Sequence, residues 1–308
     1  MDVNPVAVLA TRVATTPIPT KVLDTSIDQL LECAAAELQR SPLLPAPRAR
    51  SSDRLRSVHP ANLFGNEGFF DAQALLEASV LWQLIGELED NRVTDFCRLA
   101  FLGVLRQISR ANVKKMNTEI DEKKRPKPVL PTYASRLRDM GRMNEVLVKL
   151  HAPKVEVREG DALSLDIAPE TVGMAVIHPP YLSNTAFSES VQLPLAWLGL
   201  EHRQIWKKEL RCRGTYVHEP DGLRKYLVGW ERILSQVVKA TIKGGHVCVI
   251  IGDGRIDYVR IPMGAITKEY ASDLGLTIVR EAQHRINNAT GWTLNRRMSA
   301  QHLLVFRK

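Results

Sequence analysis

An apolar run that ends in two prolines and a tyrosine carries the clearest chemical signal in the sequence. Met174 to Ile177 is apolar and leads directly into His178-Pro179-Pro180-Tyr181. Two consecutive prolines fix φ and remove two N–H donors, so their carbonyls can point outward with little reorganisation. Such a carbonyl can accept a hydrogen bond from an amine, and Tyr181 offers a face on which a base can stack. We therefore expect residues 178–181 to form a ligand site at the carboxyl edge of a sheet.

The tetrapeptide resembles the (Asn/Asp/Ser)-Pro-Pro-(Tyr/Phe/Trp) motif of the S-adenosylmethionine-dependent amino-methyltransferases of DNA. The resemblance implies that His178 and the Pro179 carbonyl accept hydrogen bonds from the exocyclic amine of a flipped cytosine or adenine. Pro180 would complete the turn, and Tyr181 would stack on the base. The amine would attack the cofactor's methyl group directly, with no covalent enzyme intermediate. Histidine departs from the motif, because a neutral imidazole has a single acceptor nitrogen that protonation removes.

The resemblance continues outside the motif and implies a set of cofactor-binding residues. The matching segments are Gly160-Asp161-Ala162, Leu182-Ser183-Asn184, 193–200, 211–214, Gly244-Gly245, Gly252-Asp253-Gly254 and 301–308. Asp161, with Ala162, would lie near the adenine of S-adenosylmethionine. Asp2, with Asn4, would bind the ribose hydroxyls, since a carboxylate can accept two hydroxyl hydrogen bonds.

In the family, a glycine-rich loop precedes the acidic residue that corresponds to Asp2, and this loop has no counterpart in the sequence. Phe64 to Gly68 contains two glycines but follows a proline-rich connector, and Gly252-Asp253-Gly254 is followed by a segment that is not helix-like. Two explanations stay open. The natural protein begins upstream of Met1, or the chain is a truncated or inactive DNA-binding relative.

The net charge of +8 favours a polyanionic partner. Basic patches gain binding energy by displacing counterions from phosphates. We expect two groups of residues to contact nucleic acid: Lys114, Lys115, Lys123, Lys124 and Arg125 in one, and Lys207, Lys208 and Arg211 in the other. DNA is the expected partner and RNA the alternative, because the same turn can present any exocyclic amine.

Other functional classes find no support in the sequence. The four cysteines are scattered without a CxxC pair, which argues against a zinc site and for a reducing compartment. No GxSxG, HExxH or phosphate-binding Walker loop occurs. No apolar stretch approaches the roughly 20 residues that span a bilayer. We therefore expect a cytoplasmic protein without a metal or a membrane partner, and the sequence does not predict an oligomeric state.

Periodicity predicts a Rossmann-like α/β methyltransferase sheet, mostly parallel with an antiparallel C-terminal edge, and a helical insertion. Residues 1–20 would begin the core, 21–150 would form the mainly helical, basic insertion, and 151–308 would form the main core. Helices are expected over 6–13 (with Asn4 as N-cap), 26–40, 71–89, 91–110, 132–150, 221–243 and 263–275. Strands are expected over 155–157, 173–177, 246–251, 277–282 and 302–306.

Overall fold

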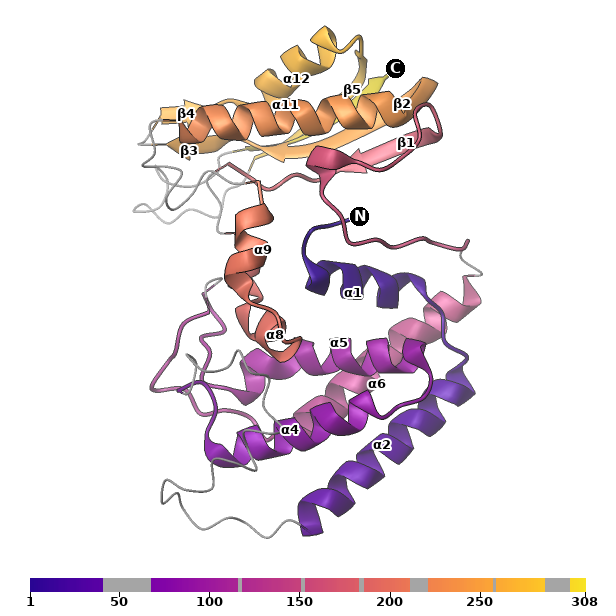
Figure 1. The fold of residues 1–308 in the computed structure, drawn as a ribbon, viewed down its shortest axis with the longest axis vertical. Coiled ribbons are helices and arrows are strands. Elements are labelled where there is room, and N and C mark those ends of the chain that lie inside the picture. The colour runs from indigo at the N-terminus through magenta and orange to yellow at the C-terminus, as the bar shows by residue number, and fades with distance from the viewer. Residues whose placement is uncertain are drawn as a thin grey trace. The chain divides into compact units, whose positions relative to one another are not determined.

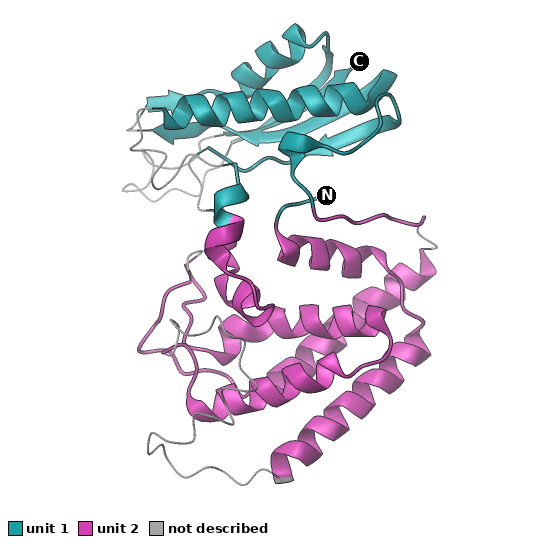
Figure 2. Cartoon of the chain, viewed as in Figure 1, with its two compact units in different colours: residues 1–3, 160–187, 206–308 teal, residues 4–159, 188–205 magenta. Residues whose placement is uncertain are grey.

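The computed structural model describes residues 1–40, 68–115, 118–150, 153–182, 186–210, 221–256, 259–285 and 300–308. The chain divides into two compact units, coloured separately in Figure 2. Unit 1 consists of residues 1–3, 160–187 and 206–308, and unit 2 of residues 4–159 and 188–205. The predicted helical segment 21–150 falls inside unit 2, together with residues 4–20.

Unit 1 is built on a four-stranded sheet with the order β1-β2-β6-β5. Its strands are β1 (Val172–Ile177), β2 (Thr241–Gly252), β5 (Thr277–Arg285) and β6 (Ala300–Arg307), and β3 (Gly254–Ile256) pairs with β4 (Val259–Ile261) in a separate ribbon. β1 is parallel to β2, whereas β6 is antiparallel to both β2 and β5. Three of the four strands therefore share one direction. Strands β1 and β2 are labelled in Figure 1. This confirms the predicted α/β class and places the antiparallel pair at one end of the sheet.

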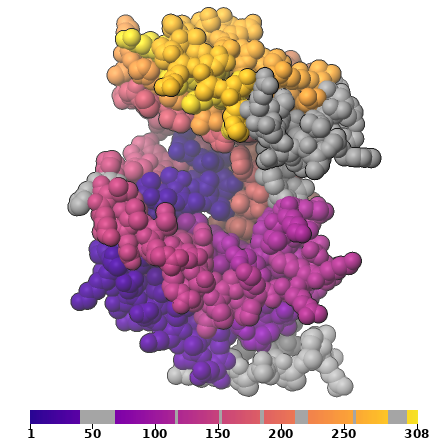
Figure 3. All heavy atoms as spheres, turned by 180° about the vertical axis from the view of Figure 1, so that it is seen from behind, coloured from indigo at the N-terminus to yellow at the C-terminus, as the bar shows by residue number. Residues whose placement is uncertain are grey.

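Two helices of unit 1, α11 (Gly222–Ala240) and α12 (Met263–Asp273), contact each other and β2. Alternate residues of β2, Val247, Val249 and Ile251, are fully buried in the core that includes Trp230 of α11. On β1, by contrast, Met174 and Val176 are 61% and 68% exposed. The alternation of β2 therefore directs one face of the sheet toward these helices. In Figure 3 the orange and yellow atoms of the C-terminal segments lie together on the surface of unit 1.

The predicted helix 221–243 ends earlier, at Ala240, and β2 begins at once with Thr241. Gly244 has a φ of 77°, a conformation that L side chains rarely adopt. A Cβ on Gly245 would lie 2.9 Å from the carbonyl oxygen of Gly173 in the neighbouring strand. The glycine pair thus lets the start of β2 turn and approach β1 closely, which periodicity alone does not reveal.

The described residues of unit 2 are mainly helical. Its helices are α1 (Pro5–Thr15), α2 (Thr20–Arg40), α4 (Ala72–Gly86), α5 (Asn91–Ile108), α6 (Val129–Lys149) and α8 (Gln192–Trp197), while α7 (Phe187–Ser190) and α9 (His202–Lys208) cross the boundary between the units. Asn4 caps α1 as predicted, since its side chain accepts from the Val6 N–H at 3.0 Å. α2 begins at Thr20 and not at Ser26, because the carbonyl of Pro19 already accepts hydrogen bonds from the next turn.

The core of unit 2 lies around α5, which has ten buried residues. Aromatic rings pack edge to face at its centre, with 4.8 Å between the ring centroids of Phe101 and Trp197 and 6.2 Å between those of Phe101 and Tyr133. Such pairs add about 0.5–1.5 kcal/mol beyond the burial of their area. Trp197 of this cluster is 1% exposed.

The predicted strand 155–157 is wrong, since residues 153–158 belong to no helix or strand. Val155 is 44% exposed, and Glu156 pairs with Arg158 at 2.7 Å. Two valines alternating with charged residues are too short a pattern to specify a strand without a paired neighbour. In the described part of the chain, no helix has the length and apolar character needed to cross a membrane.

Candidate active site

The motif lies at the end of β1, where the sequence places it. β1 ends at Ile177, and residues 178–181 follow directly. Because β1 and β2 are parallel, their carboxyl ends lie at the same edge of the sheet. β6 starts at this edge as well, since Gln301 is the register partner of Gly252, the last residue of β2. The edge therefore brings the motif near two segments that lie far from it in the sequence.

Hydrogen bonds organise the side chains of the motif. Nε2 of His178 lies 2.9 Å from the hydroxyl oxygen of Tyr181, and the two rings are nearly perpendicular, with centroids 5.2 Å apart. The amide of Gln301 donates from Nε2 to the same hydroxyl. Burial raises the pKa of Tyr181 above its ordinary value, with the bond from Gln301 acting in the opposite direction. The Tyr181 hydroxyl is thus a neutral group held between two partners.

Tyr226 of α11 holds the proline turn. Its side chain is fully buried, and its hydroxyl donates to the carbonyl oxygen of Pro180 at 2.6 Å. Pro179 is buried, whereas His178 is exposed. Sequence reasoning missed both Tyr226 and Gln301. For Tyr226 a signal exists, because a buried tyrosine in an apolar helix stripe needs a partner for its hydroxyl.

The structure brings Asp2 next to Asp161. The N–H of Gly160 donates to the Asp2 carbonyl at 3.0 Å, and the Asp161 side chain accepts from Leu163 N–H at 2.9 Å. Asp161 thereby caps η2 (Ala162–Ser164), and Ala162 packs against the core of unit 1. A Cβ on Gly160 would lie 2.5 Å from the Met1 sulfur, so a larger residue here would displace the flexible Met1 side chain. The main chain at Asp2 therefore lies beside the segment that carries Asp161, although the two residues are far apart in the sequence.

Asp253, directly after β2, organises the neighbouring elements. Its side chain is 1% exposed and accepts a hydrogen bond from Nε of Arg260 at 2.9 Å. Nε2 of His302 lies 3.1 Å away, and the N–H of Gly264 in α12 is 3.3 Å away. Asp253 therefore links the β3–β4 ribbon, the first turn of α12 and β6. The sequence marked this residue only through the glycines on either side of it.

In unit 2, Arg106 and Lys124 hold the predicted basic loop from within. Arg106 donates to the carbonyl oxygens of Asn112, Lys115 and Ser190 at 2.7–3.0 Å. The Lys124 ammonium donates to the carbonyls of Arg106 and, at 2.6 Å, Ala111. Burial lowers the pKa of Lys124. These two cations stabilise the loop through its carbonyls.

The other predicted nucleic-acid contacts lie at the surface. Lys114, Lys123 and Arg125 are exposed, and Lys115 pairs with Glu119. Lys207 and Lys208 are exposed at the end of α9 and belong to unit 1. Arg211 lies outside the described residues.

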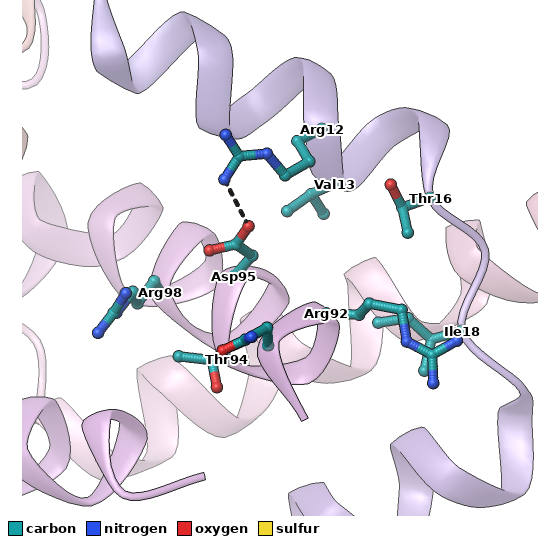
Figure 4. Close-up of a pocket in the computed structure, with 9 residues that line it drawn as sticks. Arg12, Val13, Thr16, Ile18, Arg92, Thr94, Asp95 and Arg98 are labelled. Atoms are coloured by element: carbon teal, nitrogen blue, oxygen red, sulfur yellow. Dashed lines mark hydrogen bonds and ion pairs between the residues drawn. The ribbon is translucent and has the colours of Figure 1, made fainter. Parts of the chain in front are cut away.

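A cavity of about 360 Å³ in unit 2 was not predicted from the sequence (Figure 4). It lies between α1 and α5 and is lined by residues including Arg12, Arg92 and Arg98. Arg12 pairs with Asp95 at 2.9 Å, and Arg98 lies over the ring of Trp82 at 5.8 Å. The guanidinium groups of this cavity thus pair with side chains of their own unit.

Comparison with known proteins gives only partial structural alignments at low identity. No protein-family model matches the chain, and no curated protein matches it. A proposed DNA modification methylase from Thermus thermophilus aligns over 48% of this chain and 50% of its own, with 15% identity and a TM-score of 0.30. Its complex with S-adenosyl-L-methionine gives a TM-score of 0.31. A SAM-dependent methyltransferase from Methanosarcina mazei aligns over 54% of this chain and 76% of its own, with 12% identity and a TM-score of 0.29. The chain spans about half the length of the Thermus structures that it matches.

Proposed function

We propose that the protein is an S-adenosylmethionine-dependent methyltransferase that acts on the exocyclic amine of a nucleic-acid base, with DNA as the favoured substrate. One observation carries the proposal. The His178-Pro179-Pro180-Tyr181 turn leaves β1 at the carboxyl edge of the sheet, and Gln301 and Tyr226 hold it there. Open α/β sheets bind their ligands at this edge.

The turn offers groups that suit a base carrying an amino group. The carbonyl of Pro179 can accept a hydrogen bond from the amine, while the bond from Tyr226 occupies the neighbouring Pro180 carbonyl. The ring of Tyr181 is half-buried and fixed through its hydroxyl, so it can present a preset face to the base. Base stacking on an aromatic ring contributes about 1–3 kcal/mol. His178 is exposed beside this ring and can contact the edge of the base.

The chemistry of Asp2 and Asp161 suits the cofactor. The bond between the Gly160 N–H and the Asp2 carbonyl places Asp2 beside the segment that carries Asp161, and carboxylate oxygens can accept from ribose hydroxyls or from an adenine amine. S-adenosylmethionine, when bound, supplies an electrophilic methyl group. The protein's part is to hold the amine with its lone pair directed at that methyl, which needs proximity and orientation.

The exposed cations supply a source of phosphate contacts. Residues 106–127 contain eight cationic side chains and three carboxylates, and two of the cations, Arg106 and Lys124, are directed at backbone carbonyls. Lys123 and Arg125 are exposed in this loop, as are Lys207 and Lys208 in unit 1. Removing a base from the duplex stack costs a few kcal/mol, which such contacts can offset. Each phosphate neutralised contributes about −0.9 to the log–log salt slope on duplex DNA.

Methyl transfer from radiolabelled S-adenosylmethionine to unmodified duplex DNA, with an equal amount of RNA in parallel, tests the proposal. We expect labelled amino groups in DNA bases. Tyr181→Ala should lower kcat/KM about 5- to 150-fold, the equivalent of 1–3 kcal/mol of lost stacking. Tyr270→Ala, which removes a half-buried tyrosine from α12, is the matched control and should retain the activity.

The other outcomes separate the alternatives. Label in RNA alone identifies an RNA base methyltransferase. Cofactor binding without transfer to either polymer contradicts the proposed substrate class. Failure to bind S-adenosylmethionine, measured by calorimetry on the purified chain, contradicts the proposal and favours a non-catalytic DNA-binding relative.

A further inference from the structure

Two side chains share the hydroxyl of Tyr181. His178 contacts it through Nε2 at 2.9 Å, and Gln301 donates to it through its amide nitrogen. All three residues belong to unit 1. The three groups therefore form a short hydrogen-bonded chain from β6 to the residue that follows β1.

The chemistry of these groups favours one direction of the chain. An amide NH₂ group can only donate, whereas a phenol hydroxyl has one proton to donate and lone pairs that accept. Because the Tyr181 oxygen accepts from Gln301, its own proton is available for its second partner, His178. The NH₂ group of Gln301 cannot accept this proton, whereas Nε2 of His178 accepts it when that nitrogen carries a lone pair. A neutral imidazole carries its proton on one nitrogen only, so in this arrangement the proton of a neutral His178 is on Nδ1.

We infer that Gln301 is a positioning residue that sets the tautomer of His178 through Tyr181, so that His178 presents an N–H donor at Nδ1. The sequence suggested the opposite role for His178, as an acceptor for the amine. A donor in this position selects a substrate atom with a lone pair. Cytosine and adenine both carry an unprotonated ring nitrogen next to the exocyclic amine. His178 would bind that nitrogen, and the Pro179 carbonyl would bind the amine.

The substrate part of this inference rests on the proposed function, but the tautomer does not. It can be read without substrate, by NMR of the protein labelled with ¹⁵N-histidine at a pH of about 8.5, where imidazole is neutral in water. The chain has eight histidines, and a His178→Gln variant identifies the signals of His178. We expect the proton on Nδ1. A proton on Nε2 would overturn the inference even if methyl transfer to DNA were demonstrated.

Gln301→Glu tests whether Gln301 sets the direction. A carboxylate can only accept, so the Tyr181 hydroxyl would donate to Glu and accept from His178 instead. The His178 proton should therefore move from Nδ1 to Nε2. Gln283→Glu, an exposed change on β5 at the register partner of His302, adds the same charge to the same sheet and should leave the proton on Nδ1.

An unchanged tautomer in folded Gln301→Glu would refute the role of Gln301. So would the same change in Gln283→Glu. Tyr181→Phe provides a second route if Gln301→Glu does not fold, because it removes the hydroxyl that links the two residues. We expect this variant to lose the single tautomer, and retention of the wild-type Nδ1–H signal would equally refute the inference.

Discussion

Asp253 offers the sharpest test of how the edge of the sheet is held together. Asp253→Asn preserves the shape of a side chain that is 1% exposed but removes its charge. Hydrogen bonds to charged groups contribute about 1.5–3 kcal/mol, against about 1 kcal/mol for neutral ones. Arg260 is 52% exposed, so water can hydrate its guanidinium when the bond to residue 253 weakens. The weakened hydrogen bond therefore costs about 1 kcal/mol of unfolding free energy. The new amide adds a buried donor facing Arg260 or Gly264, which costs about 1–3 kcal/mol if unpaired.

The expected loss is therefore about 2–4 kcal/mol of unfolding free energy in unit 1. Urea unfolding should show it as a lower midpoint at unchanged slope. Hydrogen exchange of the β2 and β6 amides reports on unit 1 by itself. Asp273→Asn, an exposed change at the end of α12, should stay within about 0.5 kcal/mol of wild type. If Asp253→Asn behaved like this control, the network around Asp253 would not stabilise unit 1.

Three further predictions concern other contacts. Tyr226→Phe removes the hydrogen bond to the Pro180 carbonyl, so the free energy of unfolding should fall by about 0.5–1.5 kcal/mol and methyl transfer should slow. A variant with the stability and rate of the wild type would exclude this role for Tyr226. Lys124→Met should destabilise unit 2 by about 1–3 kcal/mol in urea titrations, because two carbonyls lose their hydrogen-bond donor. The exposed change Lys123→Met should cost less than about 0.5 kcal/mol. Equal costs for the two variants would show that Lys124 does not support the loop. Asp90→Ala removes the N-cap of α5 at a cost of about 1 kcal/mol near neutral pH. The hydrogen bond from the Arg92 guanidinium lowers the pKa of Asp90 from 3.8 to about 2. The stabilisation by the Asp90 carboxylate is therefore complete above pH 3.8 and is lost as the pH falls toward 2. The measurement is the unfolding free energy of Asp90→Ala and of wild type as the pH is lowered. A difference between the two that stayed constant with pH would contradict the role of the Asp90 carboxylate.

Features encoded in consecutive residues could be predicted from the sequence. The place of the motif follows from an apolar run that meets two prolines, and Asn4 was recognisable as a cap because Pro5 follows it. The α/β class followed from the alternation of apolar strands and helices. In each case the determining interaction acts within a few residues.

Features that depend on register or on distant partners could not be predicted. Gln301 reaches Tyr181 only because β6 pairs with β2 so that it lies opposite Gly252. Asp253 finds Arg260 seven residues later and His302 in another strand, pairings that no local pattern specifies. The predicted strand 155–157 failed for a related reason, because a strand depends on neighbours that the pattern of its own residues does not reveal.

The internal support of the loop after α5 has a consequence for how such proteins diverge. Its shape depends on Arg106 and Lys124, whose charged groups donate to backbone carbonyls. These hydrogen bonds do not depend on which side chains the loop exposes at its surface. Exposed positions such as Lys114 and Lys123 are therefore open to substitution, because exchanging them leaves the loop's conformation in place. Under the proposed function, replacements at these exposed positions would change the loop's contacts with nucleic acid without changing its internal support.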